Sequence, residues 1–142
     1  MIVAKFGGSS LAEAASFLQV KGIIEASPER RFIVVSAPGK RHGNDAKITD
    51  MLLDCHRKAQ LGQSFDAEFA GVFSRFQELS KELGLPGALD DELASLRSYI
   101  ANGTTRDFIV SRGEYLCARL MASWLNIPFV DAKDAVRFDR HG

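Results

Sequence analysis

The chain has 142 residues, and its 18 basic residues balance its 18 acidic ones. This length favours one domain, and the balanced charge gives no signal for a nucleic-acid or membrane-surface partner. No apolar run approaches the roughly 18 residues of a membrane span, and the apolar start is too short for a signal peptide. Cys55 and Cys117 lie far apart, which favours reduced thiols in the cytoplasm, and the scattered histidines offer no paired spacing for a metal.

The chain opens with a short apolar run, Ile2 to Phe6, which predicts a buried strand. A glycine-rich turn ends the strand, and a helical pattern then continues from Leu11 to about Ser27. Such a unit directs backbone N–H groups toward a phosphate-sized anion, and a lysine before the turn adds a mobile positive charge. An ordinary turn with helix-capping serines explains the same pattern. The residues of this candidate anion site are Lys5, Gly7, Gly8, Ser9 and Ser10.

A second apolar run, Phe32 to Ala37, predicts another buried strand. Both runs are continuous and a helix separates them, which indicates a parallel sheet covered on both faces. The polar loop from Pro38 to Asp45 then lies at the carboxyl end of a strand, where ligands bind in open parallel sheets. This loop is either a second candidate site or a solvated surface loop.

Helical spacing dominates the middle of the chain. It predicts helices from Ile48 to Ala59, from Phe65 to Leu83 and from Leu93 to Ile100. A stripe of apolar side chains on the second of these helices is typical of a hydrophobic core: Phe65, Phe69, Phe73, Phe76, Leu79 and Leu83.

A longer helix is predicted from about Asp107 to Asn126, with one of the two preceding threonines as its cap. Gly113 inside this helix costs about 1 kcal/mol relative to alanine, which indicates the close approach of another group. Beyond the helix, Pro128 to Asp131 predicts a third strand and Val136 to Phe138 the start of a fourth. The last four residues are typical of a turn.

Four segments carry a family resemblance: Lys5–Ser10, Val34–Gly39 continuing to Ile48–Asp50, Ser111–Glu114 and Phe129–Ala132. Together they resemble the sequence pattern of aspartate kinases, in the amino acid kinase superfamily. The resemblance implies an α/β fold with a mainly parallel sheet sandwiched by helices and a helical insert in the middle. The sequence departs from the family pattern at Asp50, where asparagine is common, and at Cys117, where serine is usual.

The resemblance assigns roles to individual residues. Lys5 and the glycine turn would hold the phosphates of ATP and the transferring phosphoryl group. Thr49 would hydrogen-bond L-aspartate, and Glu114, otherwise an ordinary helix-surface carboxylate, would contact its amino group.

The implied reaction transfers the γ-phosphoryl of ATP, supplied with Mg²⁺, to the side-chain carboxylate of L-aspartate. The product is 4-phospho-L-aspartate, on the way to lysine, threonine and methionine. That carboxylate has a reference pKa of about 3.9 and is already ionised at neutral pH. The reaction therefore needs positioning and charge stabilisation but no general base.

Members of this family are much longer than this chain. Their second half supplies the nucleotide pocket and usually ACT regulatory domains. We therefore expect residues 1–142 to be the N-terminal part of a catalytic domain, inactive or nearly so alone. An incomplete sheet leaves an edge that pairs with other chains, so a homo-oligomer is expected. Two alternatives are another kinase of the superfamily, acting on a glutamate derivative, carbamate or UMP, and a non-catalytic module that binds an amino acid or a partner chain.

Overall fold

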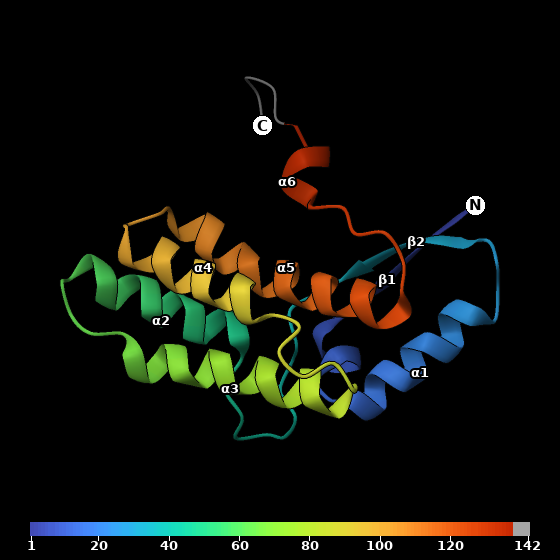
Figure 1. Ribbon diagram of the computed structural model, residues 1–142, viewed down its shortest axis with the longest axis horizontal. Coiled ribbons are helices and arrows are strands. Elements are labelled where there is room, and N and C mark those ends of the chain that lie inside the picture. Colours follow the sequence, from blue (N-terminus) through green and yellow to red (C-terminus); the bar gives the residue numbers. More distant parts are fainter. Residues whose placement is uncertain (138–142) are drawn as a thin grey trace.

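The computed structural model describes residues 1–137 as a helix-rich α/β fold (Figure 1). Its elements in chain order are β1 (Ile2–Phe6), the 3₁₀ turn η1 (Gly8–Leu11), α1 (Ala14–Glu25), β2 (Arg30–Val35), α2 (Ile48–Gln60), α3 (Asp66–Glu82), α4 (Asp90–Ala101), α5 (Arg106–Leu125) and α6 (Ala132–Ala135). Val136 and Arg137 are not in a strand. The rest of the predicted fourth strand and the predicted terminal turn, 138–142, lie outside the described residues.

The strands β1 and β2 are parallel neighbours connected through α1. In their register Lys5 pairs with Val34 and Phe6 with Val35. The ladder continues one step further, because the Ser36 N–H donates to the Phe6 carbonyl at 3.1 Å. The predicted parallel pairing is confirmed, and the loops that follow both strands therefore leave the same end of the sheet.

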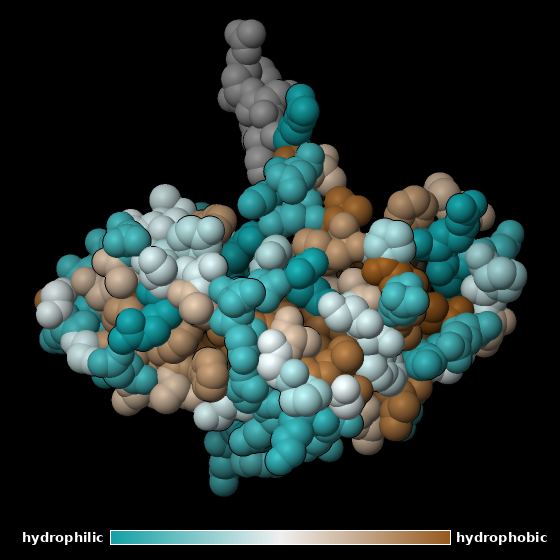
Figure 2. Space-filling view, viewed as in Figure 1, coloured by the Kyte–Doolittle hydropathy of each residue, from teal (hydrophilic) through white to brown (hydrophobic). Residues whose placement is uncertain are grey.

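One face of this sheet is uncovered within residues 1–137. Phe6 and Val35 point into the core, whereas Val3, Phe32 and Val34 on the other face are 61%, 54% and 47% exposed. The prediction of a sheet covered on both faces is wrong for the described residues, because the helices pack against one face only. Hydrophobic residues accordingly reach the surface on the right of Figure 2, over α1 and the strands.

The third predicted strand, Pro128 to Asp131, is also wrong. This segment follows α5 as irregular chain, and within the described residues the sheet contains only β1 and β2. A strand exists only where a neighbour accepts and donates the backbone hydrogen bonds of a ladder. The local sequence pattern indicates a propensity for strand structure, but it does not show whether such a neighbouring strand is present.

The helices α2, α3, α4 and α5 form the larger part of the molecule, and α2 packs against the other three (Figure 1). The predicted apolar stripe along α3 is buried except at Leu83, which is partly buried, and at Phe73, which is 41% exposed. Two steps of four residues carry Phe73 roughly 80° around the helix from Phe65, so Val72 takes the core position instead. No helix within the described range has the length and apolar character to cross a membrane.

The alternative explanation of the glycine turn, in which a serine caps the following helix, is wrong as well. Ser9 and Ser10 lie in the 3₁₀ turn η1, and α1 begins only at Ala14, with Glu13 as its N-cap residue. Neither η1 nor α1 has a side-chain cap hydrogen bond. Thr105 does occupy the N-cap position of α5, again without a side-chain hydrogen bond. Both serines are exposed, which leaves their hydroxyls free for another partner.

Candidate phosphate and substrate site

The turn after β1 and the loop after β2 touch through two glycines. The Gly39 N–H donates to the Gly8 carbonyl at 2.8 Å. A Cβ atom on Gly8 would lie 2.8 Å from the Ala37 carbonyl oxygen, and one on Gly39 would lie 2.6 Å from the Gly8 carbonyl carbon. Real side chains do not tolerate such distances to backbone, so only glycine allows this contact. The two candidate loops therefore form one continuous surface.

Gly113 provides the second close approach. A Cβ at this position of α5 would lie 2.9 Å from the Ala37 Cβ and 3.2 Å from the Ile48 Cγ2. The predicted close approach at Gly113 is confirmed, and its partners are the loop after β2 and the first residue of α2. Thr49 and Glu114 directly follow Ile48 and Gly113 in the sequence, and both are partly buried.

Apart from Lys5, the predicted site residues thus lie in three places at one end of the sheet: the glycine turn, the start of α2 and the middle of α5. The glycine turn and the loop after β2 are in direct contact, and the start of α2 and the middle of α5 adjoin that loop. Lys5 differs from the others, because its side chain shares the uncovered face of the sheet with Val34. Lys5 forms no ion pair with any residue among 1–137, so its charge is available to a ligand.

A buried ion pair that the sequence did not reveal holds the loop after β2. The Asp45 carboxylate binds Arg75 of α3, whose side chain is only 7% exposed. It also accepts hydrogen bonds from the Arg41 Nε at 2.9 Å and from the Arg41 backbone N–H at 3.0 Å. The bonds from the Arg41 side chain and backbone, together with the charge of Arg75, hold the pKa of the Asp45 carboxyl well below its usual range. The only signal in the sequence is a charged residue beside the apolar stripe of α3.

This pair predicts a pH-dependent stability. Asp45→Asn is expected to lower the free energy of unfolding at pH 7 by about 3 kcal/mol, because it leaves the buried Arg75 guanidinium without its counter-charge. The contribution of the carboxylate is complete above its unfolded pKa of about 4 and is lost as the pH falls toward the lower folded value. Urea unfolding should therefore show a steeper loss of stability below about pH 5 for the wild-type chain than for the variant. An equal acid dependence of the two proteins would contradict this assignment.

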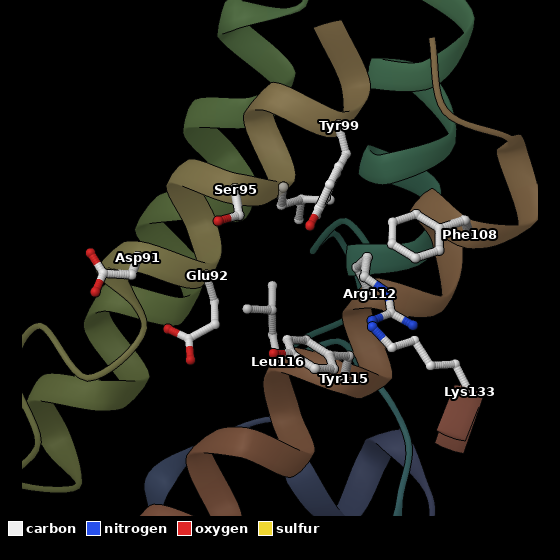
Figure 3. Close-up of a pocket in the computed structure, with 10 residues that line it drawn as sticks. Asp91, Glu92, Ser95, Tyr99, Phe108, Arg112, Tyr115, Leu116 and Lys133 are labelled. Carbon is white, nitrogen blue, oxygen red and sulfur yellow. The ribbon is translucent and has the colours of Figure 1, made fainter. Parts of the chain in front are cut away.

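A separate cavity of about 270 Å³ lies between α4 and α5 (Figure 3). Arg112 lines it on α5, two residues before Glu114, and therefore on a different side of the helix. Two charged side chains that line the cavity are already paired, since Arg112 binds Asp131 at 3.2 Å and Glu92 binds Arg119 at 2.8 Å. The cavity thus contains none of the predicted site residues.

Comparison with known proteins agrees with this architecture. No protein-family model matches the chain. The structure superposes on aspartate kinase from Clostridium acetobutylicum with a TM-score of 0.90 and 42% sequence identity, over 93% of this chain and 31% of that one. It also matches Escherichia coli aspartokinase III in complex with aspartate and ADP, with a TM-score of 0.68 and 23% identity, over 89% of this chain and 29% of that one. The fold is therefore that of an amino acid kinase-like α/β domain.

Sequence comparison gives the more particular relationship. The chain is 33% identical to Aspartokinase 3 of Bacillus subtilis and 34% identical to the chloroplastic Aspartokinase 1 of Arabidopsis thaliana. The homologues of this chain are aspartokinases, so the predicted resemblance is confirmed. The alignments cover 97% and 96% of this chain but only 33% and 25% of those relatives. The chain thus spans a third or less of their length, which is consistent with an N-terminal portion.

Proposed function

We propose that this chain supplies part of the catalytic site of an aspartate kinase, which transfers the γ-phosphoryl group of ATP to the side-chain carboxylate of L-aspartate. The product would be 4-phospho-L-aspartate, the first intermediate toward lysine, threonine and methionine. The observation that carries the proposal is the contact of Gly8 with Gly39, reinforced by the approach of Gly113 to the same loop. These contacts gather the segments that resemble aspartate kinases at the carboxyl end of the strands, where parallel sheets bind ligands.

The residues divide into a phosphate side and an amino-acid side. On the phosphate side, Lys5 would neutralise charge on the moving phosphoryl group, and the turn would contribute backbone N–H groups and hydroxyls: Gly7, Gly8, Ser9 and Ser10. On the amino-acid side, the Thr49 hydroxyl would hydrogen-bond L-aspartate and the Glu114 carboxylate would pair with its α-ammonium group. Because the acceptor carboxylate is already ionised, the site requires no general base.

Mg²⁺ would enter as part of the ATP co-substrate. The described residues include no group of three or more His, Cys, Asp or Glu side chains that could hold a metal ion. The carboxylate of the loop that contacts the glycine turn, Asp45, is already bound by Arg41 and Arg75. We therefore assign no metal ligand and no catalytic step through the metal to this part of the chain.

The chain spans a third or less of the length of the aspartokinases it matches, which supports a division of labour in which the two substrate-binding halves of the catalytic domain come from different segments. Residues 1–142 would form the N-terminal part of an amino acid kinase catalytic domain, and the nucleotide-binding half would come from outside this segment. Phosphoryl transfer requires both substrates to be held in line, so this segment alone would be inactive or nearly so. The two buried cysteines form no disulfide within the described residues, which favours the reducing cytoplasm as its location.

Exchanging the matching segment of Bacillus subtilis Aspartokinase 3 for this chain tests the proposed activity. The hybrid is expected to make an acyl phosphate from L-aspartate and MgATP, trapped with hydroxylamine, whereas the 142-residue chain alone should make none. Lys5→Ala in the hybrid should lower kcat at least about 100-fold, because a charge that stabilises the transition state is lost. Lys21→Ala is the matched control and should leave kcat unchanged, because this half-buried lysine of α1 contacts Glu25 and the Trp124 ring and no residue of the candidate site.

Two results would contradict the proposal. One is a folded hybrid that makes no acyl phosphate. The other is a hybrid in which the Lys5 and Lys21 variants are equally active. Turnover by the 142-residue chain alone would contradict the division of labour but not the activity.

The uncovered sheet predicts self-association of the 142-residue chain. Val3 and Phe32 are register partners on the open face, and each strand has one edge without a partner among the described residues. Such surfaces pair with a second chain. Sedimentation analysis is expected to show a dimer that Phe32→Lys converts to monomer, because a charge on this face opposes its burial. A monodisperse monomer of the wild-type chain at high concentration would contradict this expectation.

A further inference from the structure

Arg75 is a buried cation on a helix that the proposed catalytic roles do not involve. Its side chain is 7% exposed, and Val72 and Phe76 of the same helix belong to the apolar core. A guanidinium group is costly to bury unless its N–H donors are satisfied and its charge is paired. The hydrogen-bond and ion-pair partners of Arg75 therefore indicate which part of the structure this buried side chain stabilises.

Those partners belong to the two loops that follow the strands. The Arg75 Nη2 donates to the Gly39 carbonyl at 2.6 Å and lies 3.5 Å from the Ala12 carbonyl. The Nη1 atom donates to the Asp45 carboxylate. Ala12 follows η1, whereas Gly39 and Asp45 lie at either end of the loop after β2. One side chain thus bridges the loop after β2 and the segment that directly follows the glycine turn.

A second contact fixes the same loop to α3. Glu78, one helical turn beyond Arg75, accepts a hydrogen bond from the Arg41 Nη1 at 2.9 Å. Arg41 in turn binds the Asp45 carboxylate through its Nε at 2.9 Å and its Nη2 at 3.2 Å. The loop is therefore attached to α3 at three residues, and it passes beside this helix in Figure 1.

Gly39 is the residue on which these contacts converge. Its N–H donates to the Gly8 carbonyl at 2.8 Å, and its own carbonyl accepts from Arg75. Both peptide groups of the residue are thereby fixed in direction. Because glycine has no side chain of its own to restrict it, such external contacts must hold its backbone in place.

We propose that Arg75 is a positioning residue for the candidate site: it holds the Gly39 loop against the Gly8 turn and so fixes the surface that receives the phosphates. Arg75 acts through the Gly39 carbonyl and Asp45 and does not itself contact substrate. The link to phosphate binding rests on the proposed function, whereas the ordering of the loop does not. The helix α3 would thereby act on the site from outside it.

The test is the backbone order of the folded 142-residue chain, measured by ¹⁵N relaxation in Arg75→Met. Order parameters for residues 39–45 are expected to fall from about 0.85, typical of rigid backbone, to below about 0.6. Those of α5 should not change. Arg97→Met is the matched control, because Arg97 is 53% exposed and its ion pair with Asp66 lies away from the loop. Unchanged order in residues 39–45 would overturn the proposal, since a residue that contributes only stability leaves the folded loop as rigid as before.

If Arg75→Met does not fold, Asp45→Asn removes the same ion pair from the loop side and is expected to give the same local loss of order. A rigid loop in that variant would overturn the proposal. Calorimetric titration of the hybrid with MgATP supplies the functional readout, because the hybrid includes the nucleotide-binding half, and the variant is expected to lose at least tenfold in affinity. A disordered loop with unchanged MgATP affinity would overturn the link to phosphate binding. If the hybrid that carries the wild-type segment binds no MgATP, the proposed function fails, while the order parameters of the 142-residue chain still decide the positioning role.

Discussion

Gly39→Ala is expected to lower the free energy of unfolding by about 3 kcal/mol, at the upper end of the usual cost of overpacking. The added methyl group would lie 2.6 Å from the Gly8 carbonyl carbon and 2.9 Å from the Ser9 nitrogen. Both are backbone atoms, so no side chain can rotate away to make room. The loops must separate instead, and the hydrogen bond between Gly39 and Gly8 is lost with the contact.

The same loop provides the control for this prediction. Gly43 has no atom within 4 Å of an added Cβ and no left-handed backbone angle, so Gly43→Ala should change the stability by less than about 0.5 kcal/mol. Urea unfolding monitored by circular dichroism compares the two variants directly. Equal stabilities would mean that the two loops are not held in contact through Gly39.

Gly113→Leu is the second substitution with a large expected effect, a loss of about 3 kcal/mol or more. Already the Cβ atom would approach the Ala37 Cβ to 2.9 Å, and the rest of the leucine would have to enter the packed contact between α5, α2 and the loop. The displacement would also move Glu114 away from the start of α2. The variant should therefore lose both stability and any affinity for L-aspartate.

Gly22→Leu separates packing from helix propensity. Gly22 lies on the exposed side of α1 with nothing within 4 Å of an added Cβ, so leucine there should stabilise the chain by about 0.8 kcal/mol. The propensity gain is the same at both positions, whereas the contact exists only at Gly113. A Gly113→Leu variant as stable as Gly22→Leu in thermal unfolding would show that α5 does not approach the loop.

Features encoded in short stretches of sequence could be predicted. The parallel pairing of β1 and β2 follows from two apolar runs separated by a helix, and the packing role of Gly113 follows from a glycine inside an otherwise good helix. The helix ends were also close to those observed, because glycine, proline and periodicity mark them locally.

Features that depend on contacts between distant parts of the chain could not be predicted from the sequence. Arg75 and Gly39 are 36 residues apart, and nothing in either segment indicates that a guanidinium of one meets a carbonyl of the other. The continuous apolar run around Phe32 predicts burial on both faces of the strand, but one face is exposed. An apolar run does not show which face of a strand is covered by other elements. The start of the first helix depends on a distant residue in the same way. Gly8 contacts Gly39 of a later loop, and the chain at Gly8–Leu11 forms a 3₁₀ turn instead of the predicted start of an α-helix.

Amide chemical shifts of the ¹⁵N-labelled chain show whether one surface at the end of the sheet binds both substrates. L-aspartate and MgATP are added separately to about 10 mM, above the usual range of KM. We expect shift changes at residues 7–10 and 39 with MgATP, and changes at Thr49 and Glu114 with L-aspartate that Glu114→Gln removes. Changes confined to the cavity between α4 and α5, or no changes at all, would contradict this expectation.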